Sequence, residues 1–199
     1  MKLTSSQALD LLEQAKGKAK DDYWIEHSIC VGNTAGVIAN ALNLDEEFVK
    51  TLGYIHDIGK TFGYGGGVIP HGIKGYEYIL ELGYDEEYAN ICLTHSYLNN
   101  DINCVAGGIP NANAYKYNFK KDFIQKHKYT ICEKIVNLCD LMCKQKTMTL
   151  EKRLIDLIVR HGVHENTVYH IKEAQKLKNE FDEMLGYNIY DLFPEIIYN

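Results

Sequence analysis

The sequence predicts an all-α fold, a single-domain bundle of seven or eight helices over residues 1–199. Three observations lead to this prediction. Apolar residues recur at helical spacing through nearly all of the chain, and no convincing stretch alternates apolar and polar residues as a strand does. Neither an internal repeat nor a shift in composition marks a domain boundary, and the length suits one domain with a sizeable core.

The first half of the chain carries five predicted helices with recognisable start and stop signals. Ser5 or Ser6 and Asp45 are expected N-caps, and Gly83 is expected to close a helix in the C′ position. Residues 61–70 are a glycine-rich connection rather than a phosphate cradle, because no strand precedes them and no GK[ST] ends them. The five predicted helices span residues 5–15, 23–42, 45–59, 71–82 and 85–95.

The second half carries three more predicted helices, over residues 128–143, 149–160 and 166–185. Thr147 or Thr149 is expected to start the middle one, and Gly162 to stop it. Residues 96–118 are turn-rich and long for a connection, which is typical of a functional flap.

Composition and charge exclude several classes of protein. Hydrophobic residues make up 46% and charged residues 24% of the chain, which excludes a disordered, collagen-like or coiled-coil chain. The net charge of -6 argues against a non-specific nucleic-acid binder, which needs a basic surface. Of the 21 basic residues only Arg153 and Arg160 are arginine, a bias that we attribute to genome composition.

The compartment follows from the termini and the cysteines. The first residues lack the continuous apolar core of a signal peptide, and no segment approaches the ~20 apolar residues of a membrane span. The six cysteines form no CxxC motif and mostly lie in apolar helical stretches, which is typical of reduced, packed thiols. We therefore expect a cytoplasmic protein.

A set of histidines and aspartates lies within or at the ends of apolar helical stretches. Asp140 lies in KIVNLCDLMC, where an unpaired carboxylate would be costly to bury, so a cation, a metal or a hydrogen-bond donor must accompany it. His56 and Asp57 point roughly 100° apart on a helix and can still converge on a cation at the helix end. The same apolar setting is shared by His27, His71 and His95.

One or two divalent metal ions explain this set most economically, because imidazole and carboxylate together suit Fe, Mn, Zn, Co or Ni. One ion would be held by His27, His56, Asp57 and Asp140, and a second by His71 and His95 with Asp57 as the bridge. A two-metal site of this kind activates a hydroxide and clamps a phosphoryl group. The remaining histidines are predicted to be structural or surface residues: His127, His161, His164 and His170.

The order H…HD…H…H…D, with HDIGK at residues 56–60, resembles the HD-domain metal-dependent phosphohydrolase superfamily. The segments HSICVGNTAG, YIHDIGK, HGIKGYEYIL and ICLTHS are also similar to those of family members. The resemblance covers a motif core over residues 26–143, followed by C-terminal helices over 147–199. It implies an all-helical bundle whose core metal site is His27, His56, Asp57 and Asp140. His71 and His95 resemble the extra pair of the dinuclear branches, which include diadenosine-tetraphosphate hydrolases and cyclic-dinucleotide phosphodiesterases.

The sequence also departs from these branches. Ser96 follows His95 where the cyclic-di-GMP enzymes have HHExxDGxGYP, which disfavours a cyclic dinucleotide. The spacing from the HD pair to His71 is short compared with the diadenosine-tetraphosphate branch. Lys60 occupies the lysine position of the family's HDxxK motif. In family members a lysine at this position can contact phosphate or help to protonate a leaving group. The alternative for Lys60 is a solvated lysine at a helix C-terminus.

These inferences predict a metal-dependent hydrolase of a small phosphate ester, a nucleotide in our expectation, acting as a phosphomonoesterase or a phosphodiesterase/pyrophosphohydrolase. Asp57 and Lys60 are the expected catalytic residues. One alternative is an HD-type di-iron oxygenase, in which Tyr23 and Glu26 could be gating residues, and another is a catalytically silent metal- or nucleotide-binding regulatory module. The expected partner is a small phosphorylated substrate, with no long nucleic acid and no membrane; a homo-oligomer is left open.

Overall fold

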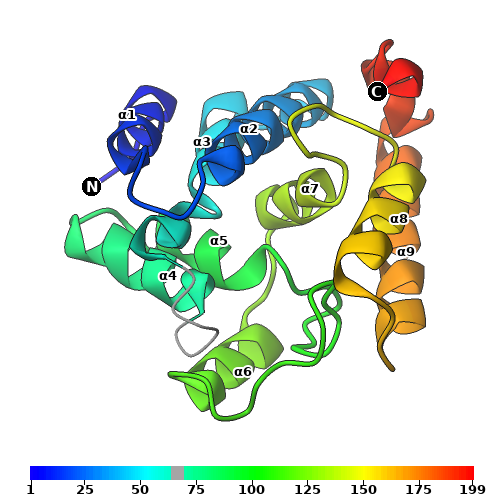
Figure 1. The fold of residues 1–199 in the computed structure, drawn as a ribbon. Coiled ribbons are helices and arrows are strands. Elements are labelled where there is room, and N and C mark those ends of the chain that lie inside the picture. The colour runs from blue at the N-terminus through cyan, green and yellow to red at the C-terminus, as the bar shows by residue number, and fades with distance from the viewer. Residues whose placement is uncertain (64–69) are drawn as a thin grey trace.

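The structure is a computed structural model that describes residues 1–63 and 70–199 (Figure 1). Within these ranges it is all α-helical, as predicted, and its only β-type pairing is an isolated bridge between Cys143 and Thr147. Most of the predicted glycine-rich connection, residues 64–69, lies outside the described residues. The α-helices are α1 (Ser5–Ala15), α2 (Tyr23–Ala41), α3 (Glu46–Ile55), α4 (His71–Glu81), α5 (Glu86–Thr94), α6 (Tyr117–Lys126), α7 (Ile131–Asp140), α8 (Leu150–His161) and α9 (Thr167–Leu185). Short 3₁₀ helices are η1 (Ile58–Phe62), η3 (Ile189–Leu192) and η4 (Ile196–Tyr198).

The described part of the chain holds nine α-helices where the sequence predicted seven or eight. The addition is α6, which follows the turn-rich segment. Its N-cap residue is Lys116, in the left-handed conformation at φ 53°, and no side chain caps the helix. Because this helix begins without a Ser, Thr, Asp or Asn cap, the sequence carries no start signal for it.

Several predicted helix ends are found at the expected residues. Asp45 caps α3 by accepting a hydrogen bond from Phe48 N at 3.0 Å, and Thr149 caps α8 by accepting from Lys152 N at 3.3 Å. Gly83 follows α4 with φ +80°, as expected for C′.

Several predicted helix ends are wrong, including both ends of the helix predicted over residues 128–143, which spans Ile131–Asp140. The N-cap of α1 is Thr4, because it forms a capping box with Gln7 that Ser5 and Ser6 cannot form. The third helix ends at Ile55 instead of near Gly59, and the chain continues through a turn into η1.

Two close backbone contacts hold the helices that surround the HD pair. A Cβ on Gly53 would lie 2.5 Å from Gly32 Cα, so α2 and α3 cross where both residues are glycine. A Cβ on Gly59 would lie 1.9 Å from the carbonyl oxygen of His71 and 2.5 Å from Gly75 N. These contacts place the end of α3 against α2 on one side and against the start of α4 on the other.

Buried apolar residues form one cluster that draws on the chain from Leu3 to Ile196. Figure 1 shows α7 beside the α2–α3 pair, with α8 and α9 side by side at the edge of the view opposite α1. In the described part of the chain, no helix is both long enough and apolar enough to cross a membrane.

Candidate metal centre

The six predicted ligands come from five helices, and most lie at a helix end. His56 is the C-cap residue of α3, and Asp57 follows in the turn before η1. His71 begins α4, and His95 is the C-cap residue of α5. The remaining two are His27, in the second turn of α2, and Asp140, the last residue of α7. The fold thus brings helix ends together around one point.

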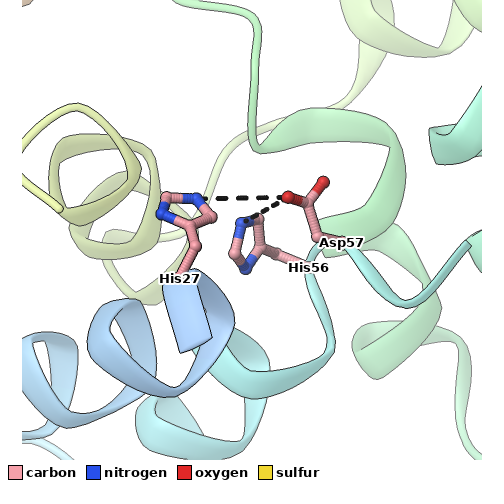
Figure 2. Close-up of side chains that lie close together, drawn as sticks. All are labelled: His27, His56 and Asp57. Atoms are coloured by element: carbon pink, nitrogen blue, oxygen red, sulfur yellow. Dashed lines mark ion pairs between the residues drawn. The ribbon is translucent and has the colours of Figure 1, made fainter. Parts of the chain in front are cut away.

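One group of side chains gathers around Asp57 Oδ2. The Nε2 atoms of His56 and His27 lie 3.5 and 4.0 Å from this oxygen. Figure 2 shows His27 reaching from α2 toward the same carboxylate oxygen as His56. Asp140 adds its Oδ1, which lies 2.9 Å from His27 Nε2 and 3.9 Å from His56 Nε2. The structure therefore brings together the four side chains that the sequence assigned to a first ion.

A second group gathers around the other oxygen of Asp57. His71 Nε2 lies 3.2 Å from Asp57 Oδ1, and His95 Nε2 lies 3.6 Å from it. The two imidazole nitrogens are 3.3 Å apart. The carboxylate of Asp57 therefore stands between two sets of nitrogen atoms, one at each of its oxygens.

The tautomers of His56 and His95 follow from their backbone contacts. His56 Nδ1 lies 2.7 Å from Gly53 O, and His95 Nδ1 lies 3.0 Å from Ile91 O. A carbonyl oxygen only accepts, so each Nδ1 must carry the proton. The neutral ring then has its lone pair on Nε2, directed at Asp57. This second contact, which orients the ring, is typical of metal-binding histidines.

The charge states of the cluster suit a cation. Burial acts against ionisation of Asp57, but Lys60 and His56 hold the pKa of its carboxyl well below the usual value. Burial lowers the pKa of His95 to about 3 and also lowers that of His71. His56 is also buried, but the carboxylates of Asp57 and Asp140 raise its pKa. At neutral pH the site therefore presents ionised carboxylates and, in His71 and His95, neutral imidazoles.

Two buried atoms of the cluster support a bound cation. His56 Nε2 and Asp57 Oδ1 have no hydrogen-bond partner in the ranges that the structure describes. Both residues are almost fully buried, at 0% and 2% exposure, so water cannot readily serve them. A buried polar atom without a partner is costly, and a metal ion would satisfy both atoms. The donor set fits divalent transition metals.

Lys60 lies at the cluster rather than in solvent. Its ammonium pairs with Asp57 Oδ2, and its side chain is 19% exposed. Lys60 lies in η1, three residues after Asp57, so one turn of helix brings the two side chains together.

The cluster opens into a cleft of about 940 Å³. Its lining includes Lys60, Lys120 and Tyr97 near the cluster, and Arg153 and Arg160 of α8. Lys120 is only 6% exposed, and its ammonium lies 4.4 Å from the centre of the Tyr97 ring. Lys120 was not among the candidate site residues singled out from the sequence. A signal for burial existed, because Lys120 precedes the buried Ile124 by one helical turn.

Two of the four histidines that were predicted to be structural or surface residues are removed from solvent. His170 is 3% exposed and lines the cleft, and burial lowers its pKa to about 4. It shares a buried stripe of α9 with Ala174 and Leu177, a helical spacing that is visible in the sequence. His127 is half-buried, and its Nε2 lies 2.8 Å from Glu133.

The gating pair suggested for an oxygenase is not kept together. Tyr23 lines the cleft, whereas Glu26 borders a separate groove beside Cys30.

A comparison with protein families finds that the HD domain model matches residues 24–158. This range contains all six residues of the cluster and most of α8.

Solved structures with a similar fold include the HD domain of the L. monocytogenes phosphodiesterase PgpH, at 19% identity and a TM-score of 0.50 over 95% of this chain and 99% of that chain. The same domain in complex with cyclic-di-AMP matches at 18% identity and a TM-score of 0.49, over 92% and 97% of the two chains. At these identities the likeness concerns the fold.

Two curated relatives are similar in sequence. An uncharacterized protein of Methanocaldococcus jannaschii, MJ0778, is 37% identical over 36% of this chain and 43% of its own. A tRNA (cytidine(56)-2'-O)-methyltransferase of Picrophilus torridus is 25% identical over 91% of this chain and 48% of its own. The chain thus spans less than half the length of either relative.

Proposed function

The chain belongs to the HD domain family, and from that premise we propose that it is a metal-dependent hydrolase of a small phosphate ester, with a nucleotide as the expected substrate. One observation carries the proposal. Asp57 is buried and offers one oxygen to each of two sets of imidazole nitrogens, and its Oδ1 has no hydrogen-bond partner in the described part of the chain.

The proposed ligands form two sets that share Asp57. His27, His56 and Asp140 complete the first set, and His71 and His95 complete the second. Fe, Mn, Zn, Co and Ni all suit these donors. When bound, such ions polarise a phosphoryl oxygen and yield a hydroxide nucleophile near neutral pH.

The chain's own residues would do the remaining work. Asp57, ionised and held between the two sets, fixes the spacing of the histidines and orients the nucleophile. Lys60 lies beside Asp57 and is placed to stabilise charge on a phosphoryl oxygen or to give its Nζ proton to the leaving group. Lys120 is a buried ammonium with no carboxylate paired to it within the described ranges, so a substrate phosphate is a suitable partner.

We also propose that residues 1–199 act as one domain. The buried cluster includes residues from Leu3 to Ile196, and α8, in the C-terminal part, lines the same cleft as the histidines. Removal of the C-terminal helices would open this cleft.

The test is a screen for the release of hydrolysis products, read as inorganic phosphate from the monophosphates and, by chromatography, as product nucleotides from the other probes. Purified protein is incubated with Mn, Fe, Co or Ni and a panel of nucleoside monophosphates, dinucleoside polyphosphates and cyclic dinucleotides. We expect metal-dependent release that His56→Ala and Asp57→Ala abolish. His164→Gln is the matched control, because this histidine lies outside both sets, and it should retain activity. Release that persists in His56→Ala and Asp57→Ala, or no release from any probe, would overturn the proposal, and Fe(II)-dependent oxygen uptake would favour the oxygenase.

A further inference from the structure

We propose that Arg153, Arg160 and Lys144 form a second anion-binding subsite in the cleft, which selects substrates that carry a second phosphate group. This inference rests on the proposed function for the first phosphate, which the histidine cluster and Lys60 would hold. It assigns the second phosphate to α8 and to the turn that precedes α8.

The three cations share a single carboxylate. Lys144 Nζ lies 3.1 Å from Asp156 Oδ1, Arg153 Nη1 lies 2.5 Å from Oδ2, and Arg160 Nη2 lies 3.0 Å from Oδ2. Burial acts to raise the pKa of Asp156, but these three cations hold it below its usual value. The carboxyl is therefore ionised at neutral pH. Three positive charges against one negative charge leave an excess of two.

The ion pair between Lys144 and Asp156 would by itself hold the turn after α7 against α8. The two arginines beside the same carboxylate therefore need another explanation. Both arginines of the chain are in this cluster, and both line the cleft. Their position in the fold gives them a role that composition did not suggest.

Arg153 is the residue that points most clearly to a ligand. It is 7% exposed, and in the described part of the chain its Nε has no hydrogen-bond partner. Within the described residues, its one side-chain hydrogen bond runs from Nη1 to Asp156. A guanidinium has five N–H donors, and burying it with most of them unused is costly. An anion in the cleft would satisfy the remaining donors of this side chain.

The cleft has room for a substrate that reaches both clusters. Its volume of about 940 Å³ lies near the top of the range of ~300–1,000 Å³ found for small-molecule sites. Among the residues that the structure describes, no ion pair joins the α8 cations to Asp57 or Asp140. The histidine cluster and the α8 cations are therefore two distinct groups of charged residues that line one cleft.

Arginine favours phosphate as the second group. Its planar guanidinium can donate two parallel hydrogen bonds to two phosphate oxygens, and the fixed charge does not depend on pH. The substrate class is therefore a nucleotide with phosphates at two positions, such as a nucleoside bisphosphate or a linear dinucleotide with a terminal phosphate.

The experiment compares probes with and without the second phosphate. The probes are 5′-AMP, adenosine 3′,5′-bisphosphate and the linear dinucleotide pApA. Arg160→Gln is the main variant, because its side chain is 43% exposed and its loss should not prevent folding. Lys152→Gln is the matched control, since Lys152 is an exposed cation on the same helix and does not line the cleft.

We expect Arg160→Gln to lower kcat/KM for the two-phosphate probes by about tenfold or more, mainly through KM, as loss of a charge-assisted hydrogen bond would. The value for 5′-AMP should stay within about twofold, and Lys152→Gln should match the wild type for all probes. The variant Arg153→Lys tests the buried residue of the three cations, because it removes the guanidinium and keeps the positive charge. Equal losses for one- and two-phosphate probes, or no loss for either, would overturn the subsite.

A binding measurement separates this inference from the proposed function. Isothermal titration calorimetry with adenosine 3′,5′-bisphosphate needs no turnover. If no probe is hydrolysed but Arg160→Gln weakens binding about tenfold, the subsite stands and the hydrolase proposal fails. If hydrolysis occurs but binding and kcat/KM are insensitive to Arg160 and Arg153, the hydrolase stands and the subsite fails.

Discussion

At the scale of single residues, the hydrogen-bond partner of one ring nitrogen decides which nitrogen of a histidine has its lone pair free for the cluster. The ring of His56 donates from Nδ1 to Gly53 O, a carbonyl in the last turn of α3, and carbonyls in the last turn of a helix lack a donor within that helix. The pairing of His56 with Asp57 could be predicted from the sequence. The tautomer could not, because it depends on where α3 ends.

His170 and Lys120 show a different limit of sequence reasoning. His170 was predicted to be a structural or surface residue and Lys120 was not singled out as a site residue, yet both are more than nine-tenths buried. Each shares a helical face with apolar residues, so periodicity alone would have placed them inward. For His170, the prediction gave more weight to the polar side chain than to this helical pattern.

Cys30 gives a prediction about reactivity. A hydrogen bond from Cys143 lowers the pKa of the Cys30 thiol to about 7, against burial, which acts to raise it. Burial raises the pKa of the other partly exposed cysteine, Cys132. The thiolate is the reactive form, so a lowered pKa moves alkylation to lower pH.

Iodoacetamide labelling followed by peptide mass spectrometry should therefore modify Cys30 first, with the rate rising through pH 7 and levelling off above it. Cys30→Ser should remove this early phase. Earlier labelling of Cys132, or a Cys30 rate that rises only above pH 8.5, the range of an ordinary thiol, would contradict the account.

At the scale of elements, the cluster depends on how helices approach one another at glycine. We predict that Gly59→Ala destabilises the protein by about 3 kcal/mol or more, because the new methyl group would overlap backbone atoms of His71 and Gly75 that cannot yield. The measurement is urea unfolding followed by circular dichroism.

Gly36→Ala is the matched control within α2. Its Cβ would lie 3.4 Å from Glu46 Cγ, an ordinary contact with a flexible side chain. Because alanine is favoured over glycine in helices, this variant should unfold within about 1 kcal/mol of the wild type, on the stable side. If Gly59→Ala were as stable as Gly36→Ala, then η1 and α4 could move apart at little cost in free energy, which would contradict the prediction.

The start of α7 carries a buried network that supports Asp140 at its other end. Glu133 is 3% exposed and accepts hydrogen bonds from Thr130 N at 2.8 Å and Thr94 Oγ1 at 3.2 Å, and lies 2.8 Å from His127 Nε2. We predict that Glu133→Ala costs about 3 kcal/mol, because it leaves these buried groups without a partner.

Thermal unfolding of Glu133→Ala can be compared with Gln7→Ala. Gln7 occupies the same position in the capping box of α1 but is exposed, so its loss should cost less than about 1 kcal/mol. Similar losses in the two variants would mean that the network around Glu133 adds nothing to its helix cap.

The helices themselves were largely predictable, and α6 explains the exception. Periodicity together with caps at Asp45 and Thr149 located the other elements. α6 begins at a lysine in a left-handed conformation, which no composition rule anticipates. Its position is set by contacts with the rest of the molecule, since it carries the buried Lys120 and Ile124.

At the scale of the whole molecule, net charge and local charge have opposite signs. The chain has a net charge of -6, yet five of the residues that line the cleft are lysine or arginine: Lys60, Lys120, Lys144, Arg153 and Arg160. From the net charge we expected no basic surface of the kind that binds nucleic acid. Only the fold reveals that α8, remote in sequence from the HD pair, adds cations to the same cleft, and a small anionic substrate suits that distribution.

The central claim is that one carboxylate, Asp57, joins two metal sites, and metal content per chain tests it most directly. Protein loaded with Mn or Fe and then passed through a desalting column is analysed by inductively coupled plasma mass spectrometry. We predict close to two ions per chain in the wild type, close to one in His71→Ala, and none in Asp57→Ala, with His164→Gln unchanged. An Asp57→Ala protein that binds as much metal as the wild type would contradict the account.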